Sequence, residues 1–364
     1  MTKAAELAKM GEVLTNSQIG GRRNILINGA MNVAQRATSS TGISTSGYYT
    51  VDRFQLFMGN TDGRVTASQV ADVHDGFANA LKLECTTADT SIASSEFFGV
   101  QTKIEGQDVQ QFKKGSSDAE SITVSFYVKG NASATFAVEL FDNDNSRQAS
   151  QLFSVTTSWT RVTKTFTPDT TGAFDDNNES SLVLAFWLHG GSNFTSGTLS
   201  STFVSSNNVN RAAGISSFLD STDRTFFITG IQLEVGSVAT PFEHRSFGEE
   251  LLLCQRYYYS IVFQTNNKYV GHGSYYNTSQ LFWFKDLPTT MRTAPTLEIA
   301  AGTNYYTAYR TSNADGVNTF NISTATPDGV MFQNTTEASV GSEGAGAIIY
   351  TANDAASIAL KAEL

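Results

Sequence analysis

Cysteines and long apolar runs are both scarce in this chain. Its 364 residues include two cysteines, Cys85 and Cys254, which are too few for the disulfide framework of a small secreted domain. The residues beside them predict buried free thiols. No apolar run reaches membrane-spanning length, and no apolar signal segment stands near the N-terminus. We therefore expect a protein that is made in a reducing cytoplasm and does not insert into membranes.

Charged residues are also few. They make up 16% of the chain, the formal net charge is −10, and the basic residues are scattered, with Arg22–Arg23 and Lys113–Lys114 as isolated pairs. A nucleic-acid partner requires a basic face that releases counterions, so this charge pattern excludes one. By contrast, 25 Phe, 13 Tyr and 3 Trp supply ample apolar surface for folded cores.

Motifs for catalysis are missing as well. The chain contains no His-Glu-x-x-His, Cys-x-x-Cys or Gly-x-Ser-x-Gly sequence and no phosphate-binding loop. Glycoside hydrolysis needs two facing carboxylates, but the acidic residues stand mostly in turn-forming runs. We expect no enzyme and no cofactor, with calcium as an open point. Asp142 and Asp144 offer oxygen ligands in one loop and are weak calcium candidates, the alternative being that they only form a turn.

Short segments with a period of two are abundant. Residues 121–129 alternate apolar and polar side chains, and 226–235 have one well-buried face and one mixed face. Clusters of Asn, Asp, Ser and Gly separate such segments, and no long helix stands between them. This predicts an all-β fold with a jelly-roll β-sandwich over residues 22–245. Its strands are predicted at 25–33, 52–57, 64–69, 80–85, 97–104, 121–129, 135–141, 150–155, 160–166, 181–188 and 225–235.

A short amphipathic helix is predicted at the N-terminus, in a docking and hinge segment spanning residues 1–21. A lone helix of this length is marginal in water, so its apolar stripe requires a second subunit, another protein or the rest of this chain. We expect the stripe to serve docking and oligomerisation, a frayed terminus being the alternative. The residues of the stripe are Leu7, Met10, Val13 and Leu14.

A linker helix and a smaller C-terminal β domain are predicted for residues 246–364. Ser246 and Glu249 form a capping box at the start of a helix over 246–258. The last predicted strand fits a place in a sheet or at a subunit interface. The strands of this domain are predicted at 261–264, 280–286, 296–300, 318–323, 329–333, 347–350 and 357–362.

Five segments that occur in order along the chain carry a family resemblance. They are Arg23–Met31 (RNILINGAM), Val51–Phe54 (VDRF), Gly230–Arg245 (GIQLEVGSVATPFEHR), Leu253–Tyr258 (LCQRYY) and Met291–Pro295 (MRTAP). Together they resemble the tail-fibre and tail-associated structural proteins of tailed phages. The modules of those proteins are similar to family 4/9 carbohydrate-binding modules, so the resemblance implies a jelly roll of that kind.

The resemblance also implies a function. We expect a non-enzymatic virion protein of a tailed phage, a tail-fibre or tail-tip component synthesised in the host cytoplasm. It would assemble as a homotrimer, bind host cell-surface polysaccharide through several weak sites, and attach to other tail or virion proteins through its N-terminal helix. Two alternatives stay open: an architectural head, neck or adaptor protein that binds no glycan, and a depolymerase of surface polysaccharide.

Glycan binding requires exposed aromatic side chains beside polar ones. Ring faces pack against the C–H edges of a sugar, while amides and carboxylates bond to its hydroxyls. The alternative for each aromatic residue is a place in the core or at an interface. The candidates are Tyr269, Tyr275, Tyr276, Trp283, Tyr305 and Tyr306 in the C-terminal domain, and Trp187 with the nearby Phe194 in the jelly roll.

Overall fold

The structure is a computed structural model that describes Lys3 and residues 23–311, 313–339 and 341–364. The chain divides into two compact units. The first unit runs to Phe247 and includes Leu364, and the second unit spans Gly248–Glu363. The expected boundary after residue 245 lies close to this division. The predicted N-terminal helix, with Leu7, Met10, Val13 and Leu14, lies outside the described residues.

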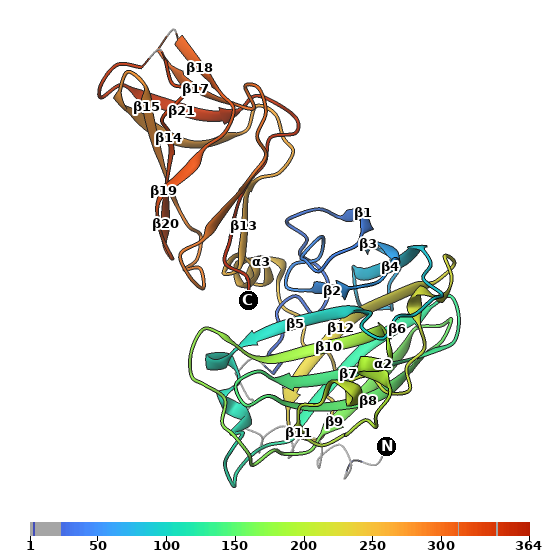
Figure 1. The fold of residues 1–364 in the computed structure, drawn as a ribbon. Coiled ribbons are helices and arrows are strands. Elements are labelled where there is room, and N and C mark those ends of the chain that lie inside the picture. Colours follow the sequence, from blue (N-terminus) through green and yellow to red (C-terminus); the bar gives the residue numbers. More distant parts are fainter. Residues whose placement is uncertain (1–2, 4–22, 312, 340) are drawn as a thin grey trace. The chain divides into compact units, whose positions relative to one another are not determined.

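The first unit is a jelly-roll sandwich of two antiparallel six-stranded sheets (Figure 1). Sheet A has the order β1 (Ser39–Ile43), β3 (Arg64–Val70), β4 (Ala80–Thr87), β12 (Thr225–Val235), β6 (Ile122–Gly130) and β9 (Thr160–Phe166). Sheet B has the order β11 (Val204–Ser205), β8 (Arg147–Val155), β7 (Ala134–Asp142), β10 (Ser180–Gly190), β5 (Phe97–Glu105) and β2 (Gln55–Gly59). Short helical turns connect them: η1 (Gly106–Asp108), η2 (Gln110–Phe112), α2 (Ser192–Thr195), η3 (Asn208–Asn210) and η4 (Phe218–Asp220).

The core of the first unit lies between the two sheets, where alternate residues of each strand point inward. On β10 the inward residues are Leu182, Leu184, Phe186 and Leu188, all with no exposed surface. Removing these side chains from water supplies the main driving force for the sandwich. Cys85 is buried in this core as a free thiol, as the sequence predicts.

The segment 25–33, which the sequence predicts as a strand, is irregular in the structure. Asn24 and Asn28 are both buried, and Asn28 has a φ of 61°, in the left-handed region that a strand cannot contain. The Asn28 side chain replaces the missing ladder bonds, because it donates to the carbonyls of Val33 and Asp52 and accepts from the Val33 amide. Side-chain bonds to the backbone have here displaced regular strand pairing.

Much of the motif Gly230–Arg245 forms a hydrogen-bonded clasp over sheet A. The buried carboxylate of Glu234 accepts bonds from the Thr240 amide at 2.9 Å, the Thr240 hydroxyl at 2.7 Å and the Gln232 amide group at 3.0 Å. Gln232 in turn accepts a bond from the Glu243 amide, and the Glu243 carboxylate accepts one from the Asn24 amide. The clasp, Gln232 to Glu243 with Asn24, therefore fastens the start of the first unit to its last strand.

The second unit begins with α3 (Phe247–Gln255, whose first residue belongs to the first unit), within the predicted linker helix 246–258. It contains two antiparallel sheets. The three-stranded sheet has the order β13 (Tyr258–Val262), β22 (Ile358–Lys361), β16 (Thr296–Ile299). The seven-stranded sheet has the order β18 (Asn313–Val317), β17 (Tyr306–Arg310), β21 (Gly346–Thr351), β14 (Tyr269–Asn277), β15 (Gln280–Asp286), β20 (Gly329–Asn334), β19 (Asn321–Thr326). The predicted last strand is β22, the centre of the smaller sheet, whereas β14, β17 and β18 were not predicted.

We expect Glu234→Ala to destabilise the first unit by about 2 to 3 kcal/mol, because the Thr240 and Gln232 donors lose a buried acceptor. Calorimetry of the full chain measures this as a lower transition temperature for the first unit. Glu84→Ala is the matched control, since Glu84 is partly exposed on sheet A and pairs with Lys82; it should cost less than about 1 kcal/mol. Equal transitions in both variants would contradict a structural role for the clasp.

Candidate functional site

The outer face of sheet B carries a second apolar cluster, separate from the sandwich core. The outward residues of β10 belong to it, with Trp187 only 3% exposed and Ala185 2%. Phe57 of β2 and Ala137 of β7 extend it across the sheet. A jelly roll needs apolar residues only between its sheets, so this outer cluster requires a separate explanation.

Strand register places the outward side chains of sheet B in two parallel rows. One row runs Phe57, Gly99, Trp187, Ala137 across β2, β5, β10 and β7. The neighbouring row runs Gln55, Gln101, Ala185, Glu139 across the same strands. The aromatic row and the polar row are thus neighbours on the same face, two residues apart along each strand, and both contain small residues.

Gly99 is required in the aromatic row. A Cβ atom at this position would lie 2.5 Å from the Phe57 ring and 2.1 Å from the backbone oxygen of Phe186. The Phe57 ring therefore lies directly over the glycine backbone. Gly59 and Phe97 repeat this arrangement at the next pair, where a Cβ would approach the Phe97 ring to 2.6 Å.

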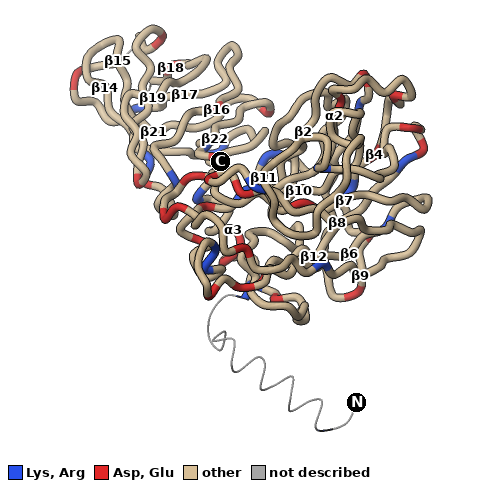
Figure 2. Tube along the Cα trace, turned by 60° about the horizontal axis from the view of Figure 1, so that its bottom comes forward, with Lys and Arg blue, Asp and Glu red and all other residues tan. Residues whose placement is uncertain are grey.

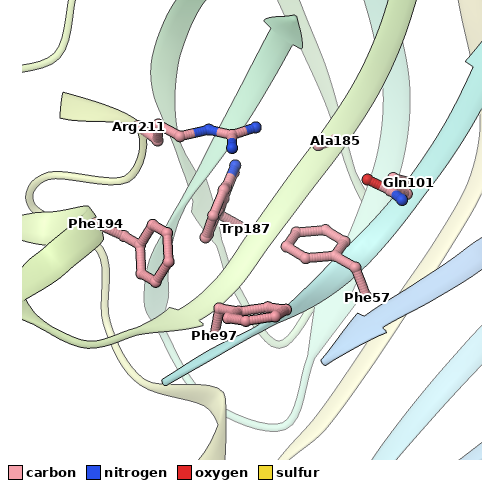
Figure 3. Close-up of a pocket in the computed structure, with 7 residues that line it drawn as sticks. All are labelled: Phe57, Phe97, Gln101, Ala185, Trp187, Phe194 and Arg211. Carbon is pink, nitrogen blue, oxygen red and sulfur yellow. The ribbon is translucent and has the colours of Figure 1, made fainter. Parts of the chain in front are cut away.

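The long connection between β10 and β12 covers part of this face and leaves a pocket of about 140 Å³. Phe194 of α2 and Arg211, which follows η3, enter from the connection, and the strands supply the remaining residues (Figure 3). The pocket is lined by Phe57, Phe97, Gln101, Ala185, Trp187, Phe194 and Arg211.

The aromatic walls hold one another in place. The Trp187 ring meets Phe57 edge-on with centroids 5.0 Å apart, and it lies 5.3 Å from Phe194. Phe194 also contacts Phe97 edge-on at 5.7 Å. Such edge-on contacts stabilise a pocket whose walls are already packed before any ligand enters.

Glu139 fixes the polar side of the pocket. Its fully buried carboxylate accepts two bonds from Arg211, at 2.9 and 2.8 Å, and one from the Trp187 indole nitrogen at 2.8 Å. The guanidinium lies over the rings of Phe141, at 4.6 Å, and Trp187, at 5.0 Å. Because Nε and Nη2 bind Glu139, Nη1 of Arg211 keeps its donors free within the described residues.

Gln101 supplies the second polar group of the pocket. Its amide nitrogen donates to Oε1 of Gln55 at 2.6 Å, so its own Oε1 remains able to accept a bond within the described chain. The pocket therefore offers one donor group and one acceptor group among several rings. That combination suits a small, largely apolar ligand face with a few hydroxyl or amide groups.

Trp187 and Phe194 are the sequence candidates that the structure brings into this pocket. Phe57, Phe97 and Arg211 were not predicted. Strand alternation could have placed Phe57 and Phe97 outward, but the pairing of β2 with β5 was needed to bring them beside Trp187. Arg211 lies in an irregular connection that carries no periodic signal.

Three of the predicted glycan-contacting residues in the second unit are core residues instead. Tyr275, Trp283 and Tyr306 are at most 1% exposed and belong to the apolar cluster of that unit. The hydroxyl of Tyr275 donates to Asp315, and that of Tyr306 to the carbonyls of Ala300 and Ser357. Their rings offer no face to solvent, so the prediction is wrong for these three. On a strand buried on one face, half of any aromatic run points inward.

The other three predicted tyrosines of the second unit are at least partly exposed to solvent. Tyr269 and Tyr276 are each 70% exposed on β14, and Tyr305 is half-buried against the core of the second unit. Glycan binding by Tyr269, Tyr276 and Tyr305 stays a prediction.

An apolar band crosses the outer face of the seven-stranded sheet. Register aligns Tyr309, Ile348, His272, Phe284 and Met331 in one row over β17, β21, β14, β15 and β20. Phe284 is 63% exposed. An exposed apolar row of this kind suits contact with another macromolecule.

Asp142 already holds a cation, the ammonium of Lys114. The two side chains are buried and their charged atoms lie 2.6 Å apart. Lys114 also contacts Asp169 at 3.1 Å and donates to the carbonyls of Thr171 and Gly172. Four oxygens thus surround the ammonium as they would a metal ion. The described residues hold no group of three or more His, Cys, Asp or Glu side chains suited to a metal, and calcium at Asp142 would have to displace Lys114.

Asp144 bonds to a backbone amide and not to a cation. Its carboxylate accepts a bond from the Asp175 amide at 2.9 Å, as expected for a side chain that shapes a turn. Calcium binding by this loop stays a prediction that no contact supports.

His189 makes a Glu–His–Ser arrangement that resembles part of a catalytic triad. Its Nε2 lies 3.0 Å from the Glu96 carboxylate, and its Nδ1 lies 2.8 Å from the Ser217 hydroxyl. His189 is fully buried, and it is not among the residues lining the pocket described above. A triad needs a substrate within reach of the serine, so we assign these bonds to joining the loops before β5 and after β10.

Part of the chain that contains this site is similar to a known family. Residues 99–190 match the family model of a carbohydrate binding domain, of family 4/9. The match contains Gln101, Ala185 and Trp187 of the pocket. It covers a carbohydrate-binding and not a catalytic domain. No curated protein matches the chain.

Solved structures of similar shape include carbohydrate-binding modules and a phage tailspike. The structure titled "CBM4 structure and function" has 11% identity and a TM-score of 0.29, covering 57% of this chain and 97% of that one. The CBM22-1 xylan-binding domain of Paenibacillus barcinonensis Xyn10C has 14% identity and a TM-score of 0.28, covering 55% and 94%. The enzymatically active domain of bacteriophage CBA120 tailspike protein 4 has 10% identity and a TM-score of 0.30, covering 58% of this chain and 21% of that one.

Charge and hydropathy add two observations. Basic residues are interspersed with acidic ones in both units (Figure 2). Among the described helices, none has the length and apolar character needed to span a membrane.

We expect acid to weaken the Lys114 cluster. Burial alone would raise the pKa of Asp169, but bonds from Arg147 and Lys114 outweigh it and hold that pKa below 3.8. A depressed pKa in the folded state stabilises the protein above the unfolded-state value, about 4, and this stabilisation is lost as the pH falls through the folded value. Asp169→Asn should therefore lower stability at pH 7 and flatten its pH dependence below about pH 5.

Denaturation of the full chain between pH 7 and pH 2 measures this difference. Asp176→Asn is the control, because Asp176 is exposed. Parallel pH profiles for the wild type and Asp169→Asn would show that Asp169 contributes nothing to acid sensitivity.

Proposed function

We propose that the first unit binds glycan through the sheet B pocket. The observation that supports this most strongly is the pocket itself. Four aromatic rings line it together with a donor and an acceptor on the outer face of a jelly-roll sheet, and three of its residues lie in the region that matches a carbohydrate binding domain. The sandwich core explains none of these outward rings.

Binding would use the two kinds of wall for different tasks. The rings of Phe97, Phe194 and Phe57 pack against the C–H edges of a sugar and supply most of the contact area. Arg211 Nη1 donates to a sugar oxygen, and Gln101 Oε1 accepts from a hydroxyl or amide, which fixes the orientation. Because Glu139 holds Arg211 and Trp187 in place before binding, little conformational entropy is lost.

We propose further that the chain is a non-enzymatic virion component of a tailed phage, a tail fibre or tail tip that contributes to host recognition. The sequence resemblance in Arg23–Met31 and Gly230–Arg245 supports this. These segments supply the residues of the clasp, which closes the jelly roll in this chain. In this proposal the N-terminal segment attaches to other virion proteins and a homotrimer presents three pockets, so that weak sites gain avidity on a repetitive cell surface.

The alternative is an architectural virion protein whose contacts are with other proteins. The apolar band of the second unit, Tyr309 to Met331, is the observation that favours it, because exposed apolar rows of this kind commonly form protein interfaces.

We expect Phe194→Ala and Ala185→Leu each to weaken glycan binding at least about tenfold. The first variant removes one aromatic ring from the pocket lining, and the second fills part of the pocket with a larger side chain. Binding to an immobilised panel of bacterial capsular, O-antigen and teichoic glycans measures the loss. Calorimetric transitions should confirm that both variants fold.

Tyr276→Ala is the matched control, since it removes a highly exposed ring from the second unit. It should bind like the wild type. Loss of binding in this variant alone would transfer glycan recognition to the second unit, and absence of binding by the wild type would favour the architectural alternative.

We expect the purified full-length chain to have three times the mass of one chain in light scattering at micromolar concentration. Removal of residues 1–21 separates two roles, because a fragment that keeps the trimer mass but no longer joins virions would assign that segment to docking. A monomeric full-length chain would contradict the multivalent mechanism.

A further inference from the structure

The connection between β10 and β12, residues 191–224, covers much of the outer face of sheet B on β7 and β8. Hydrogen bonds fasten it there. The Ser150 amide of β8 donates to the carbonyl of Ser200 at 2.7 Å, and the Asn207 amide donates to the side-chain oxygen of Gln148 at 3.0 Å. The connection is therefore part of the folded sheet surface and takes up space that a ligand would otherwise occupy.

Exposure along the polar row shows where a ligand can reach this face. Gln55 on β2 and Gln101 on β5 are partly exposed. Beyond them, Ala185 on β10, Glu139 on β7 and Ser150 on β8 are all at most 2% exposed. Access therefore stops at β10, where the connection begins to cover the sheet.

The aromatic row is interrupted at the same place. Trp187 on β10 is 3% exposed and Ala137 on β7 has no exposed surface, but Leu152, the next residue of the row on β8, is 36% exposed. The face is thus accessible at β2 and β5 and again at Leu152, and it is covered in between. A glycan chain that crossed the sheet would have to pass through the space that the connection fills.

Phe194 closes the pocket along the strands. It lies on α2, which follows directly after β10, and its ring lies 5.3 Å from Trp187 and 5.7 Å from Phe97. Arg211, from the same connection, bounds the pocket across the strands (Figure 3). A ligand therefore approaches from the side of β5 and β2, and its path ends against the connection.

The volume of the pocket agrees with this closed shape. Its 140 Å³ is well below the range of about 300 to 1,000 Å³ that is usual for sites enclosing a drug-sized ligand. The space suits one sugar residue and not several consecutive ones. The lining combines aromatic rings with the polar groups of Gln101 and Arg211, which suits a residue that has an apolar ring face and several free hydroxyls.

Residues inside a glycan chain differ from residues at its end. An internal residue is linked on both sides, so the chain has to leave a binding site in two directions. A terminal residue is linked on one side only and keeps a hydroxyl that an internal residue has lost to its second linkage. Because a surface polysaccharide is attached to the cell at its reducing end, its free termini are the non-reducing end and the tips of side branches.

We propose that the sheet B pocket binds the terminal residue of a glycan, at the non-reducing end of the main chain or at the tip of a side branch, and that the connection 191–224 excludes internal chain segments. This selection of termini rests on the proposed glycan binding and names its ligand class. Contact with a single residue gives low affinity, in agreement with a mechanism that relies on several weak sites.

The test varies the length of the glycan. A panel polysaccharide that binds is hydrolysed, and its component sugars, as methyl glycosides, and its short and long oligosaccharides are titrated into the full-length protein and followed by NMR. We expect the best methyl glycoside to bind within about tenfold of the longest oligosaccharide, because further residues lie outside the pocket. An affinity that increases by more than about tenfold with chain length would overturn the proposal.

Stoichiometry on the intact polysaccharide separates the two sources of the terminal residue. Saturation at one pocket per chain assigns the non-reducing end of the main chain, and saturation that grows with the number of side branches assigns the branch tips. Saturation that grows with the length of an unbranched chain would contradict both.

Two variants connect the length dependence to this face of the sheet. Leu152→Ala is the matched control, because Leu152 continues the aromatic row beyond the covered part and is not among the lining residues. We expect it to leave the affinity for every chain length unchanged, and a loss confined to long oligosaccharides would show that chains cross the sheet. Ala185→Leu fills part of the pocket and should lower the affinity for the methyl glycoside and for the longest oligosaccharide by the same factor.

The outcomes separate the selection of termini from the proposed function. If panel glycans bind in a Phe194-dependent manner but the affinity grows with chain length, the selection of termini is overturned and glycan binding by the pocket stands. If neither methyl glycosides nor panel glycans bind to the wild type, the proposed function fails and the selection of termini fails with it.

Discussion

The buried carboxylate of Glu139 is the constraint on which the candidate site depends. A charge without exposed surface must be neutralised and fully hydrogen-bonded, and here Arg211 and Trp187 meet that requirement together. Their bonds fix the Trp187 ring orientation and hold the β10–β12 connection against sheet B. The connection carries Phe194, so the same carboxylate indirectly positions the opposite wall of the pocket. Removing the carboxylate would therefore disturb the positions of Arg211, Trp187 and Phe194 together.

The same requirement recurs wherever this fold buries polar groups. Lys114 is surrounded by Asp142, Asp169 and two carbonyls, and Glu234 is satisfied by Thr240 and Gln232. In each case a buried charge or donor joins a loop to a strand. Loop positions in the jelly roll are thus set by local pairing of polar groups, while the apolar core sets the arrangement of the sheets.

Strands with strong alternation could be predicted from the sequence, and segments governed by side-chain hydrogen bonds could not. The limits 160–166, 225–235 and 280–286 match β9, β12 and β15. In β9 and β15 burial on one face imposes a period of two, whereas β12 is buried on both faces. The segment 25–33 is also rich in apolar residues but is irregular, since Asn24 and Asn28 bond to the backbone. The strand β14 was missed, because its glycines and polar residues give no apolar period.

The candidate site was predictable only in part, for a physical reason. Trp187 could be recognised as an aromatic residue on a strand, but its neighbours Phe57 and Phe97 come from strands far away in sequence, and only the pairing of sheet B brings them together. Tyr275, Trp283 and Tyr306 show the opposite error, because sequence spacing alone does not tell the inward face of a strand from the outward one.

The chain contains three tryptophans, and their indole N–H signals report on three different places. Trp187 lies at the sheet B pocket, Trp159 packs on Phe227 of sheet A, and Trp283 lies in the core of the second unit. The most direct measurement is an NMR titration of the isotope-labelled full-length protein with a glycan that it binds. The three indole signals are assigned by Trp→Phe variants and followed through the titration. We expect the Trp187 signal to shift and saturate while the other two remain in place. A saturating shift at Trp283 or Trp159, with Trp187 unchanged, would contradict it.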